Sequence, residues 1–579
     1  MSGRHALRLL ARLGFTAGLL AAALPALAAK GSKPEFGANV LIFDPSMSSQ
    51  VIQKQIDAGY ATQQHNEFGP QRKALLFLPG SYSVDVPVGF YTEVMGLGAS
   101  PDATRIAGNM HADANLEHNN ATTTFWRAAE GLSVAPTGGK MQWAVSQAVS
   151  LRRMHVRGDL VLHQNHGWAS GGWMSDSVVD GNVDSGSQQQ WISRNCDWKS
   201  WTGANWNMVF VGVVHPPAGA WPSPPYTKIA QTPVVREKPF LQVNAAGEFS
   251  VRVPELSSDS VGITWRGGET EGETIPIERF YIARPDVDTA DTINVQLARG
   301  KHLILTPGIY ELTAPIRLTR PRTVMLGLGF ATLRPVKGTA AMTTADADGI
   351  EIAGLLFDAG PSESPVLLDV GREGSRAHHA NDPITQHDVF FRVGGAGVGR
   401  AKVNLRINSN DTLVDHTWIW RADHGAGVGW ELNTSENGLV VNGNEVTIYG
   451  LFVEHHRKFQ VLWKGNGGRT YFYQSEIPYD PPNQASYTSA PGVNGWASYK
   501  VADGVTSHEA WGLGVYSVFK HPDVVLTRAI ETPESPQVRF HDMITLALGD
   551  HGGISRVIDD TGEATAMHPR VAPKVTNFP

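Results

Sequence analysis

The chain contains a single cysteine, Cys196, among 579 residues. One cysteine excludes an intramolecular disulfide, so the fold must be stabilised by burial and hydrogen bonds. Charged residues are also scarce at 18%, and 48 Lys and Arg against 55 Asp and Glu leave a net charge of −7. Without an excess of positive charge, the chain lacks a general field that would attract phosphate backbones or anionic lipid. Nucleic acid is therefore not expected as a partner.

Long hydrophobic runs are absent except at the N-terminus. Three arginines at positions 4, 8 and 12 precede an apolar stretch over residues 13–24, and small residues follow at 25–28. This order is typical of a secretory signal peptide, and the apolar stretch is shorter than the roughly 20 residues that span a bilayer. The sequence predicts a signal peptide at residues 1–28. It predicts a secreted chain, extracellular or periplasmic where an outer membrane exists, with no membrane attachment after cleavage.

Glycine, proline and tryptophan are abundant, at 61, 35 and 16 residues. This composition is typical of a turn-rich β protein, and aromatic surfaces often pack against sugar rings. After residue 36, short β-rich runs are broken by Gly, Asn and Asp, and a helical pattern appears only near 51–59 and 293–300. We therefore expect an all-β protein, with a carbohydrate as the first candidate substrate.

An internal repeat divides the chain. KALLFLPGSY at 73–82 recurs as KHLILTPGIY at 301–310, and each copy is followed by Gly-Leu-Gly. Within each half, similar runs recur at irregular steps of about 20 residues, as in parallel β-helices whose coils stack about 4.8 Å apart. The prediction is two tandem right-handed parallel β-helices packed side by side, at 36–235 and 275–579, joined by a long linker at 236–274. A sandwich or propeller is less favoured because short hairpin turns are few.

Aligning the coils of the second half places Trp420, Glu454 and Glu476 in one column. Mutual repulsion and partial burial would raise the pKa of one carboxyl, leaving an acid and a base near neutral pH. Paired carboxylates of this kind are the machinery of glycosidases. The alternative is that both glutamates are solvated charges on the outside of the β-helix, which is their commoner use.

Polar and aromatic residues surround this column. In the first half, Gln147, Ser170 and Gln188 align in a column that could hold a water molecule or form a simple polar ladder. Adjacent histidine pairs at 378–379 and 455–456 lack the spacing of a helical zinc site, so neither a metal nor a cofactor is expected. Aromatic rings beside acid, Arg and His side chains are typical of a sugar subsite, and the candidates are Trp418, Trp420, Arg421, Asp423, His424, His455 and Tyr479.

Several long motifs occur in a recognisable order over essentially the whole mature chain: WAVSQA at 143–148, WASGGW at 168–173, SQQQW at 187–191, REKPFL at 236–241, LLFDAG at 355–360, WRADHG at 420–425, GLFVEHH at 450–456 and SEIPYDPPNQA at 475–485. Together they resemble bacterial members of glycoside hydrolase family 55, the exo-acting β-1,3-glucanases. The resemblance implies an inverting hydrolase with its active site between the two β-helices. Such an enzyme removes glucose from the non-reducing end of laminarin-like β-1,3-glucan.

The resemblance also implies a role for each site residue. Glu476 resembles the general acid, and Gln147, Ser170 and Glu454 resemble the set that holds the nucleophilic water, with Glu454 as proton acceptor. The resemblance implies that Trp420 and Tyr479 line sugar subsites, and Arg421, Asp423, His424 and His455 complete the expected substrate-binding set. His166 departs from the pattern, because an aromatic residue is expected there in relatives.

Two other functions remain open from the sequence. A β-helix polysaccharide lyase would need Ca²⁺ or a basic cluster to acidify a uronic acid, whereas the candidate wall is rich in carboxylates. A non-catalytic glycan-binding solenoid would bind glucan without releasing sugar. In either case the expected partner is a glucan or other polysaccharide, and the chain is predicted to be a monomer.

Overall fold

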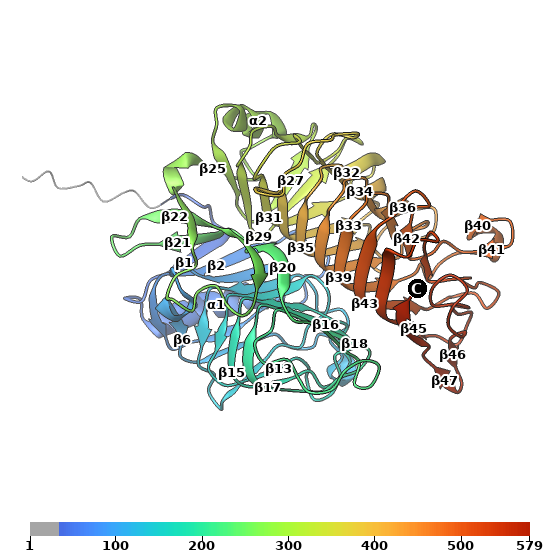
Figure 1. Ribbon diagram of the computed structural model, residues 1–579. Helices are drawn as coiled ribbons and strands as arrows, with labels where there is room; N and C mark the ends of the chain where they lie inside the picture. Colours follow the sequence, from blue (N-terminus) through green and yellow to red (C-terminus); the bar gives the residue numbers. More distant parts are fainter. Residues whose placement is uncertain (1–33) are drawn as a thin grey trace, which may run out of the picture.

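The computed structural model describes residues 34–579, so the predicted signal peptide lies outside the described residues. Within them the chain is nearly all-β, as predicted, with two α-helices, α1 (Ser49–Gln63) and α2 (Ala290–Ala298). No helix of the described part is long and apolar enough to cross a membrane. Two parallel β-helices lie side by side, the first in blue to green and the second in yellow to red (Figure 1).

The first β-helix, here the first rod, is built of short parallel strands. Its sheet nearest the second rod has the order β1 (Val40–Phe43), β2 (Lys73–Phe77), β5 (Thr92–Gly96), β8 (Arg127–Glu130), β11 (Val149–Arg152), β14 (Trp173–Ser175), β16 (Gln190–Arg194), β18 (Asn207–Val211) and β19 (Tyr226–Ile229). The other faces carry β3 (Gly80–Tyr82), β4 (Asp85–Pro87), β6 (Thr104–Ile106), β7 (Asn109–His111), β9 (Ser133–Val134), β10 (Lys140–Gln142), β12 (His155–Val156), β13 (Asp159–Val161), β15 (Val178–Asp184) and β17 (Asp197–Thr202).

The second rod repeats this plan with longer strands. Its large sheet comprises β25 (Phe280–Ala283), β26 (His302–Leu305), β27 (Ile309–Leu312), β29 (Val324–Pro335), β31 (Glu351–Asp358), β33 (Thr385–Val393), β35 (Leu413–Arg421), β37 (Thr447–Glu454), β39 (Gly468–Glu476), β43 (His508–Ser517), β45 (Val538–Ala547) and, antiparallel at the end, β48 (Lys574–Phe578). The opposite sheet comprises β28 (Ile316–Leu318), β30 (Met342–Thr344), β32 (Ser364–Val370), β34 (Ala401–Ile407), β36 (Ser435–Val441), β38 (Val461–Trp463), β42 (Tyr499–Val501) and β44 (Ile530–Glu531).

The repeated sequence motif opens each rod in the same way. Tyr82 donates its hydroxyl proton to the carbonyls of Phe43 and Leu78 at 2.9 and 2.8 Å. Tyr310, the matching residue of the second copy, contacts the carbonyls of Ala283 and Thr306 at 2.8 and 3.1 Å. The two tyrosines therefore fix equivalent first coils, which explains why the repeat is readable in the sequence.

The long strands of the second rod bend at left-handed residues. The bends in β37 and β43 are Gly450 (φ +64°) and Gly512 (φ +67°). A Cβ atom on Gly450 would lie 2.6 Å from the ring of Trp173, and one on Gly512 would lie 2.4 Å from Val209. At these two bends the close approach of the first rod requires glycine, since the left-handed conformation alone is also adopted by His416 in β35 and Phe472 in β39.

The two rods run in the same direction and touch along their length. Strands β2 and β5 contact β29 near one end, and β18 contacts β39 and β43 near the other. Between them lies a buried apolar cluster formed by Phe90, Tyr91, Phe125, Trp126, Ala128, Ala148, Trp173, Ile192, Val209 and Val211 of the first rod and Phe330, Leu356, Phe390, Trp418, Trp420, Ala422, Tyr449, Phe452, Tyr471 and Phe472 of the second. Burial of these large rings drives the side-by-side arrangement.

Buried ion pairs orient this contact. Arg152 of the first rod binds Asp388 and Asp415 of the second, both at 2.7 Å. Arg194 binds Asp415 at 2.9 Å and Glu237 of the connecting segment at 2.6 Å. Because buried charges are costly unless paired, these contacts favour one placement of the rods over slipped alternatives.

The connecting segment is ordered as two small antiparallel sheets. One pairs β20 (Thr232–Arg236) with β23 (Leu256–Ser260), and the other comprises β21 (Phe240–Val243), β22 (Phe249–Pro254) and β24 (Gly272–Pro276). Lys238 lies between the rods, 3.1 Å from Glu93 and 2.7 Å from Glu130. The segment thus contributes charges to the interface as well as joining the rods.

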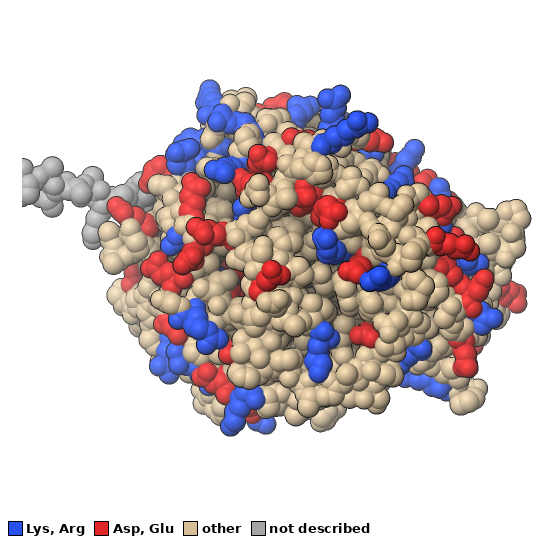
Figure 2. All heavy atoms as spheres, viewed as in Figure 1, with Lys and Arg blue, Asp and Glu red and all other residues tan. Residues whose placement is uncertain are grey.

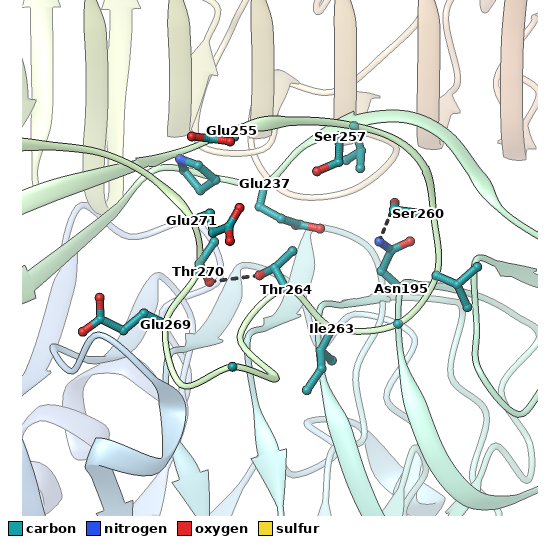
Figure 3. Close-up of a pocket in the computed structure, with 15 residues that line it drawn as sticks. Asn195, Glu237, Glu255, Ser257, Ser260, Ile263, Thr264, Glu269, Thr270 and Glu271 are labelled. Atoms are coloured by element: carbon teal, nitrogen blue, oxygen red, sulfur yellow. Dashed lines mark hydrogen bonds between the residues drawn. The ribbon is translucent and has the colours of Figure 1, made fainter.

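A pocket opens within the connecting segment. Figure 3 shows Glu237, Glu255, Glu269 and Glu271 around it, together with Ser, Thr and Asn side chains. No aromatic residue lines it. It lacks the ring surface on which a sugar would stack, whereas the contact between the rods is rich in aromatic rings.

Candidate active site

The predicted carboxylate column is present in the second rod. The strand register pairs Trp420 with Glu454 and Glu454 with Glu476, on the adjacent strands β35, β37 and β39. The two glutamates therefore stand on neighbouring coils, whose backbones lie about 4.8 Å apart. The next coil brings Tyr516 into register with Glu476.

Glu454 lies at the floor of the site, 3% exposed. Its Oε1 accepts a hydrogen bond from Nε2 of Gln147 at 2.8 Å, and its Oε2 accepts one from the indole of Trp418 at 2.9 Å. Burial raises the pKa of Glu454 to about 7, and the charge of Asp423 adds to the shift, although both hydrogen bonds oppose it. Glu454 can therefore change its protonation state near neutral pH.

The first rod supplies Gln147 and Ser170, as expected. Each precedes a left-handed corner residue, Ala148 (φ +57°) and Gly171 (φ +114°), respectively. The Ser170 hydroxyl donates to Oε1 of Gln147 at 3.0 Å, so Gln147 bridges Ser170 and Glu454. Ser170 and Gln147 of the first rod and Glu454 of the second thus form one chain of hydrogen bonds.

Gln188 does not share the Gln147–Ser170 column, contrary to the sequence alignment. The bridge pairs Ala169 with Gln188, which moves Gln188 by one position. Its side-chain amide donates to the carbonyls of Val145 and Leu162, both at 2.9 Å, and it is fully buried. A shift of one residue turns a side chain to the opposite face of a strand, so Gln188 packs inward.

Glu476 is half-buried and so is more exposed than Glu454. Its side chain accepts a hydrogen bond from the hydroxyl of Tyr479, in the loop that follows β39. Burial, followed by the charges of Glu454 and Asp423, raises the pKa of Glu476 well above its ordinary value. The hydrogen bonds direct the Glu454 carboxylate toward Gln147 and Trp418 and that of Glu476 toward Tyr479. The pair therefore contains one carboxyl suited to remain protonated.

Asp423 and His424 form the side of the site toward Trp420. His424 Nδ1 lies 2.9 Å from Asp423, and its Nε2 lies 2.7 Å from Glu67 of the first rod. These two carboxylates raise the pKa of His424 to about 10 against the opposing effect of burial. His424 therefore remains charged at neutral pH and holds Asp423 ionised.

These features coincide with similarities to known proteins. An exo-β-1,3-glucanase of Streptomyces sp. (strain SirexAA-E / ActE) is 45% identical over 548 residues, covering 94% of this chain and 90% of that protein. The chain belongs to glycoside hydrolase family 55. The model of the LAM55 pectate lyase-like domain matches residues 280–476, which end at the carboxylate of the proposed acid.

Solved structures of family 55 agree with the fold of the whole chain. The structure of sacteLam55A from Streptomyces sp. SirexAA-E has a TM-score of 0.92 at 45% identity, covering 94% of this chain and 99% of that one. A variant of sacteLam55A refined in complex with glucose matches equally well. The paired parallel β-helices are therefore the family 55 architecture, and the chain is a glycoside hydrolase.

Arg421 has a different role from the one expected of a family 55 substrate-binding residue. Its guanidinium forms two hydrogen bonds with Asp480 at 2.9 and 2.8 Å. Its remaining donors bind the carbonyls of Gly429, Asn433 and His455. All five N–H groups are thus used within the protein, and none is left for a sugar. Arg421 instead anchors the loop that carries Tyr479.

The other predicted binding residues differ in accessibility. Trp418 and Trp420 stack on each other with ring centroids 4.7 Å apart and are 0% and 1% exposed, so Trp420 supports the wall and offers little free ring surface. His455 is also buried, with Nδ1 3.2 Å from the carbonyl of Ile477. Asp423, His424 and Tyr479 are half-buried and can reach a ligand.

The sequence analysis did not single out Trp168 or Glu67 as site residues. Trp168, two residues before Ser170, is 46% exposed, and its ring lies 6.2 Å from that of Trp206. Its position in the WASGGW motif was a usable signal. No sequence pattern pointed to Glu67, because its contact with His424 joins residues 357 positions apart.

Metal chemistry has no evident ligand set in the described chain. Residues 34–579 contain no group of three or more His, Cys, Asp or Glu side chains placed to hold a metal ion. Cys196 is buried, and burial raises the pKa of its thiol, so a reactive thiolate is disfavoured.

Proposed function

We propose that this protein is a secreted exo-β-1,3-glucanase that removes glucose from the non-reducing end of laminarin-like glucan with inversion. The observation that carries the proposal is the chain Ser170–Gln147–Glu454 beside Glu476, built from both rods. Glu476 protonates the leaving glycosidic oxygen. A water molecule held by Gln147, Ser170 and Glu454 attacks the anomeric carbon and gives its proton to Glu454.

The face of the molecule that carries the connecting segment has no large patch of one charge. On the face seen in Figure 2, basic and acidic residues are interspersed among broad uncharged areas. A lyase acting on uronic acids would benefit from a free basic group at the site, yet Arg421 has all its donors engaged. A non-catalytic solenoid would gain nothing from two buried carboxyls whose pKa values are raised.

The test is incubation of the protein with laminarin, followed by chromatography of the products. Glucose as the first and main product supports the proposal. An unsaturated product absorbing in the ultraviolet would establish a lyase instead, and tight glucan binding without any released sugar would establish a binding solenoid.

The pH dependence of kcat/KM is expected to be bell-shaped. Activity requires ionised Glu454 and protonated Glu476, so it rises with pH through the Glu454 pKa of about 7 and falls through the raised pKa of Glu476. Asp423→Asn removes a charge that raises both pKa values, so both limbs should move to lower pH. The measurement is kcat/KM against pH for the wild type and Asp423→Asn on a laminari-oligosaccharide. Identical pH profiles for the two proteins would contradict the expectation.

Trp168 is expected to bind the sugars of the leaving group. Its exposed ring lies beside Trp206, whose ring centroid is 5.1 Å from that of Tyr516, the register neighbour of Glu476. Trp168→Ala should lower kcat/KM for laminaripentaose about tenfold through lost stacking, and for laminaribiose much less. Trp168→Phe should preserve most of the effect. Equal losses on both substrates would contradict this assignment.

A further inference from the structure

His455 is a buried titratable side chain next to the proposed base, Glu454. It follows Glu454 at the end of β37 and adopts the left-handed conformation (φ +66°). Its backbone N–H donates to the carbonyl of Glu476 at 2.8 Å, and its side chain is buried. The residue therefore adjoins both glutamates of the site, although the reaction proposed above gives it no part.

The imidazole of His455 is held in one orientation. Nδ1 lies 3.2 Å from the carbonyl oxygen of Ile477, so Nδ1 carries the hydrogen and donates it there. The ring also meets that of Tyr479 edge-on, with the centroids 4.4 Å apart. Because the bond made by one nitrogen sets the tautomer of a neutral histidine, Nε2 is left with a lone pair.

This lone pair faces acidic side chains. Nε2 is 4.0 Å from Oε2 of Glu454 and 3.9 Å from Oδ1 of Asp423. The other charged groups near the ring are Arg421, which donates to the carbonyl of His455, and Asp480, which is paired with that arginine. Burial lowers the pKa of His455 and outweighs the opposing charge of Asp423, so the imidazole is neutral near pH 7.

The contacts of Glu454 do not serve its two protonation states equally. The amide of Gln147 and the indole of Trp418 are donors, at 2.8 and 2.9 Å. Gln474, which is fully buried, also lowers the pKa of Glu454, and this is the effect of a donor. Three donors favour the ionised carboxylate and offer its protonated form no acceptor. A buried hydroxyl without an acceptor is unfavourable, so a proton taken up by Glu454 needs one.

Nε2 of His455 is an acceptor within reach. The last torsion of a glutamate side chain is soft, so a rotation of the carboxyl group can turn Oε2 of Glu454 toward Nε2 across the 4.0 Å that separates them. Catalytic hydrogen bonds are often long in a free enzyme and shorten when the substrate is bound.

We infer that His455 is a positioning residue for the base: its Nε2 accepts a hydrogen bond from Oε2 of Glu454 once this carboxylate has taken the proton of the attacking water. In that step an O–H bond of the water breaks while its oxygen joins the anomeric carbon, and the proton binds Oε2. The Nδ1–H of His455 stays on the carbonyl of Ile477, and Glu476 gives its own proton to the leaving oxygen. Exchange with solvent restores both glutamates after glucose leaves. The inference rests on the proposed function and makes Glu454 a stronger base than its three donors alone would allow.

The test is kcat/KM against pH for wild type, His455→Asn and His455→Phe on a laminari-oligosaccharide. Asparagine suits the left-handed conformation and can still donate to Ile477. Phenylalanine keeps a ring against Tyr479, and Phe472 already adopts the same backbone conformation in β39. The two variants therefore preserve different structural features of His455, but both lack the Nε2 lone pair.

Both variants should move the rising limb of the profile to lower pH by about one pH unit, because protonated Glu454 loses its acceptor. At the optimum, kcat/KM should fall about tenfold, since Glu454 is then a weaker base. The falling limb, which reports Glu476, should stay in place. This pattern differs from that of Asp423→Asn, which should move both limbs.

His508→Asn is the matched control, since His508 is a buried histidine of the same rod whose Nε2 lies 3.0 Å from the hydroxyl of Tyr499. Its rising limb should coincide with that of the wild type, whatever its Tm. A folded His455 variant that keeps the wild-type rising limb, or moves it to higher pH, would overturn the inference, and so would an equal shift in His508→Asn. If thermal unfolding shows that one His455 variant does not fold, the other decides. Failure of the proposed function would be distinct, because the wild type would then release no glucose at any pH.

Discussion

Replacing Glu476 with glutamine is expected to lower kcat on laminarin about a thousandfold, within the range found when a general acid is removed. The leaving group is a sugar alcohol, which departs poorly unless its oxygen is protonated. Glutamine preserves the size and the contact with Tyr479 but carries no transferable proton. The measurement is glucose release by purified variants, with Glu563→Gln, a change at an exposed residue far along the chain, as the matched control.

A second substrate separates loss of the acid from general damage. Hydrolysis of 2,4-dinitrophenyl β-glucoside needs no protonation of its leaving group, so Glu476→Gln should retain most of the wild-type rate on it. Equal losses on both substrates would mean that Glu476 binds or orients the sugar instead. Full activity on laminarin would remove Glu476 from the reaction altogether.

The same substitution should stabilise the fold at alkaline pH. Because the folded state raises the pKa of Glu476, the folding free energy benefits from its protonated form and loses that benefit as pH rises through the folded pKa. Glutamine never ionises. The Tm of Glu476→Gln should therefore exceed that of the wild type increasingly as pH rises above the ordinary glutamate pKa of 4.5, and an identical pH dependence for both proteins would contradict the raised pKa.

The second large effect is expected from Arg194→Leu, which should destabilise the protein by about 3–5 kcal/mol at pH 7. Arg194 is fully buried and neutralises Asp415 and Glu237 together, with hydrogen bonds of 2.6 to 2.9 Å. Leucine fills much of the space but leaves the buried carboxylate of Glu237 without its ion pair and leaves Arg152 as the only arginine paired with Asp415. Urea or thermal unfolding measures the loss.

Arg266→Leu is the matched control. Arg266 is 65% exposed and lies 3.3 Å from Asp197, so its removal should cost less than about 1 kcal/mol.

The loss of stability in Arg194→Leu should also shrink as pH falls. In the folded wild type the pKa of Asp415 is lowered, so ionised Asp415 contributes to stability above the ordinary aspartate pKa. Protonation of Asp415 in acid removes that contribution. A deficit that stays constant as pH falls from neutrality to well below the ordinary aspartate pKa of 3.8 would contradict the electrostatic explanation.

The parallel β-helix could be predicted because its evidence is local. The two copies of the repeat become β2–β3 and β26–β27, with Tyr82 and Tyr310 making matching bonds. Alternation along β35, β37 and β39 was sufficient to align Glu454 with Glu476, which the register confirms. Both signals depend on residues that are neighbours in sequence or on adjacent coils.

The parts that the sequence did not provide depend on register or on distant contacts. Gln188 was misplaced because the step between its coil and that of Ser170 is uncertain by one residue, and one residue reverses a side chain. Arg421 reads as a free cation until the carbonyls of remote loops are seen around it. The contact of Glu67 with His424 exists only once two rods are packed together.

The stereochemistry of the first product tests the central claim most directly. If water held jointly by Gln147 and Glu454 attacks while Glu476 protonates the leaving oxygen, the reaction is a single displacement. Proton NMR during the first minutes with laminaritriose should then show α-glucose before mutarotation. β-Glucose appearing first would require a covalent glycosyl-enzyme and would contradict the role assigned to the residues of both rods.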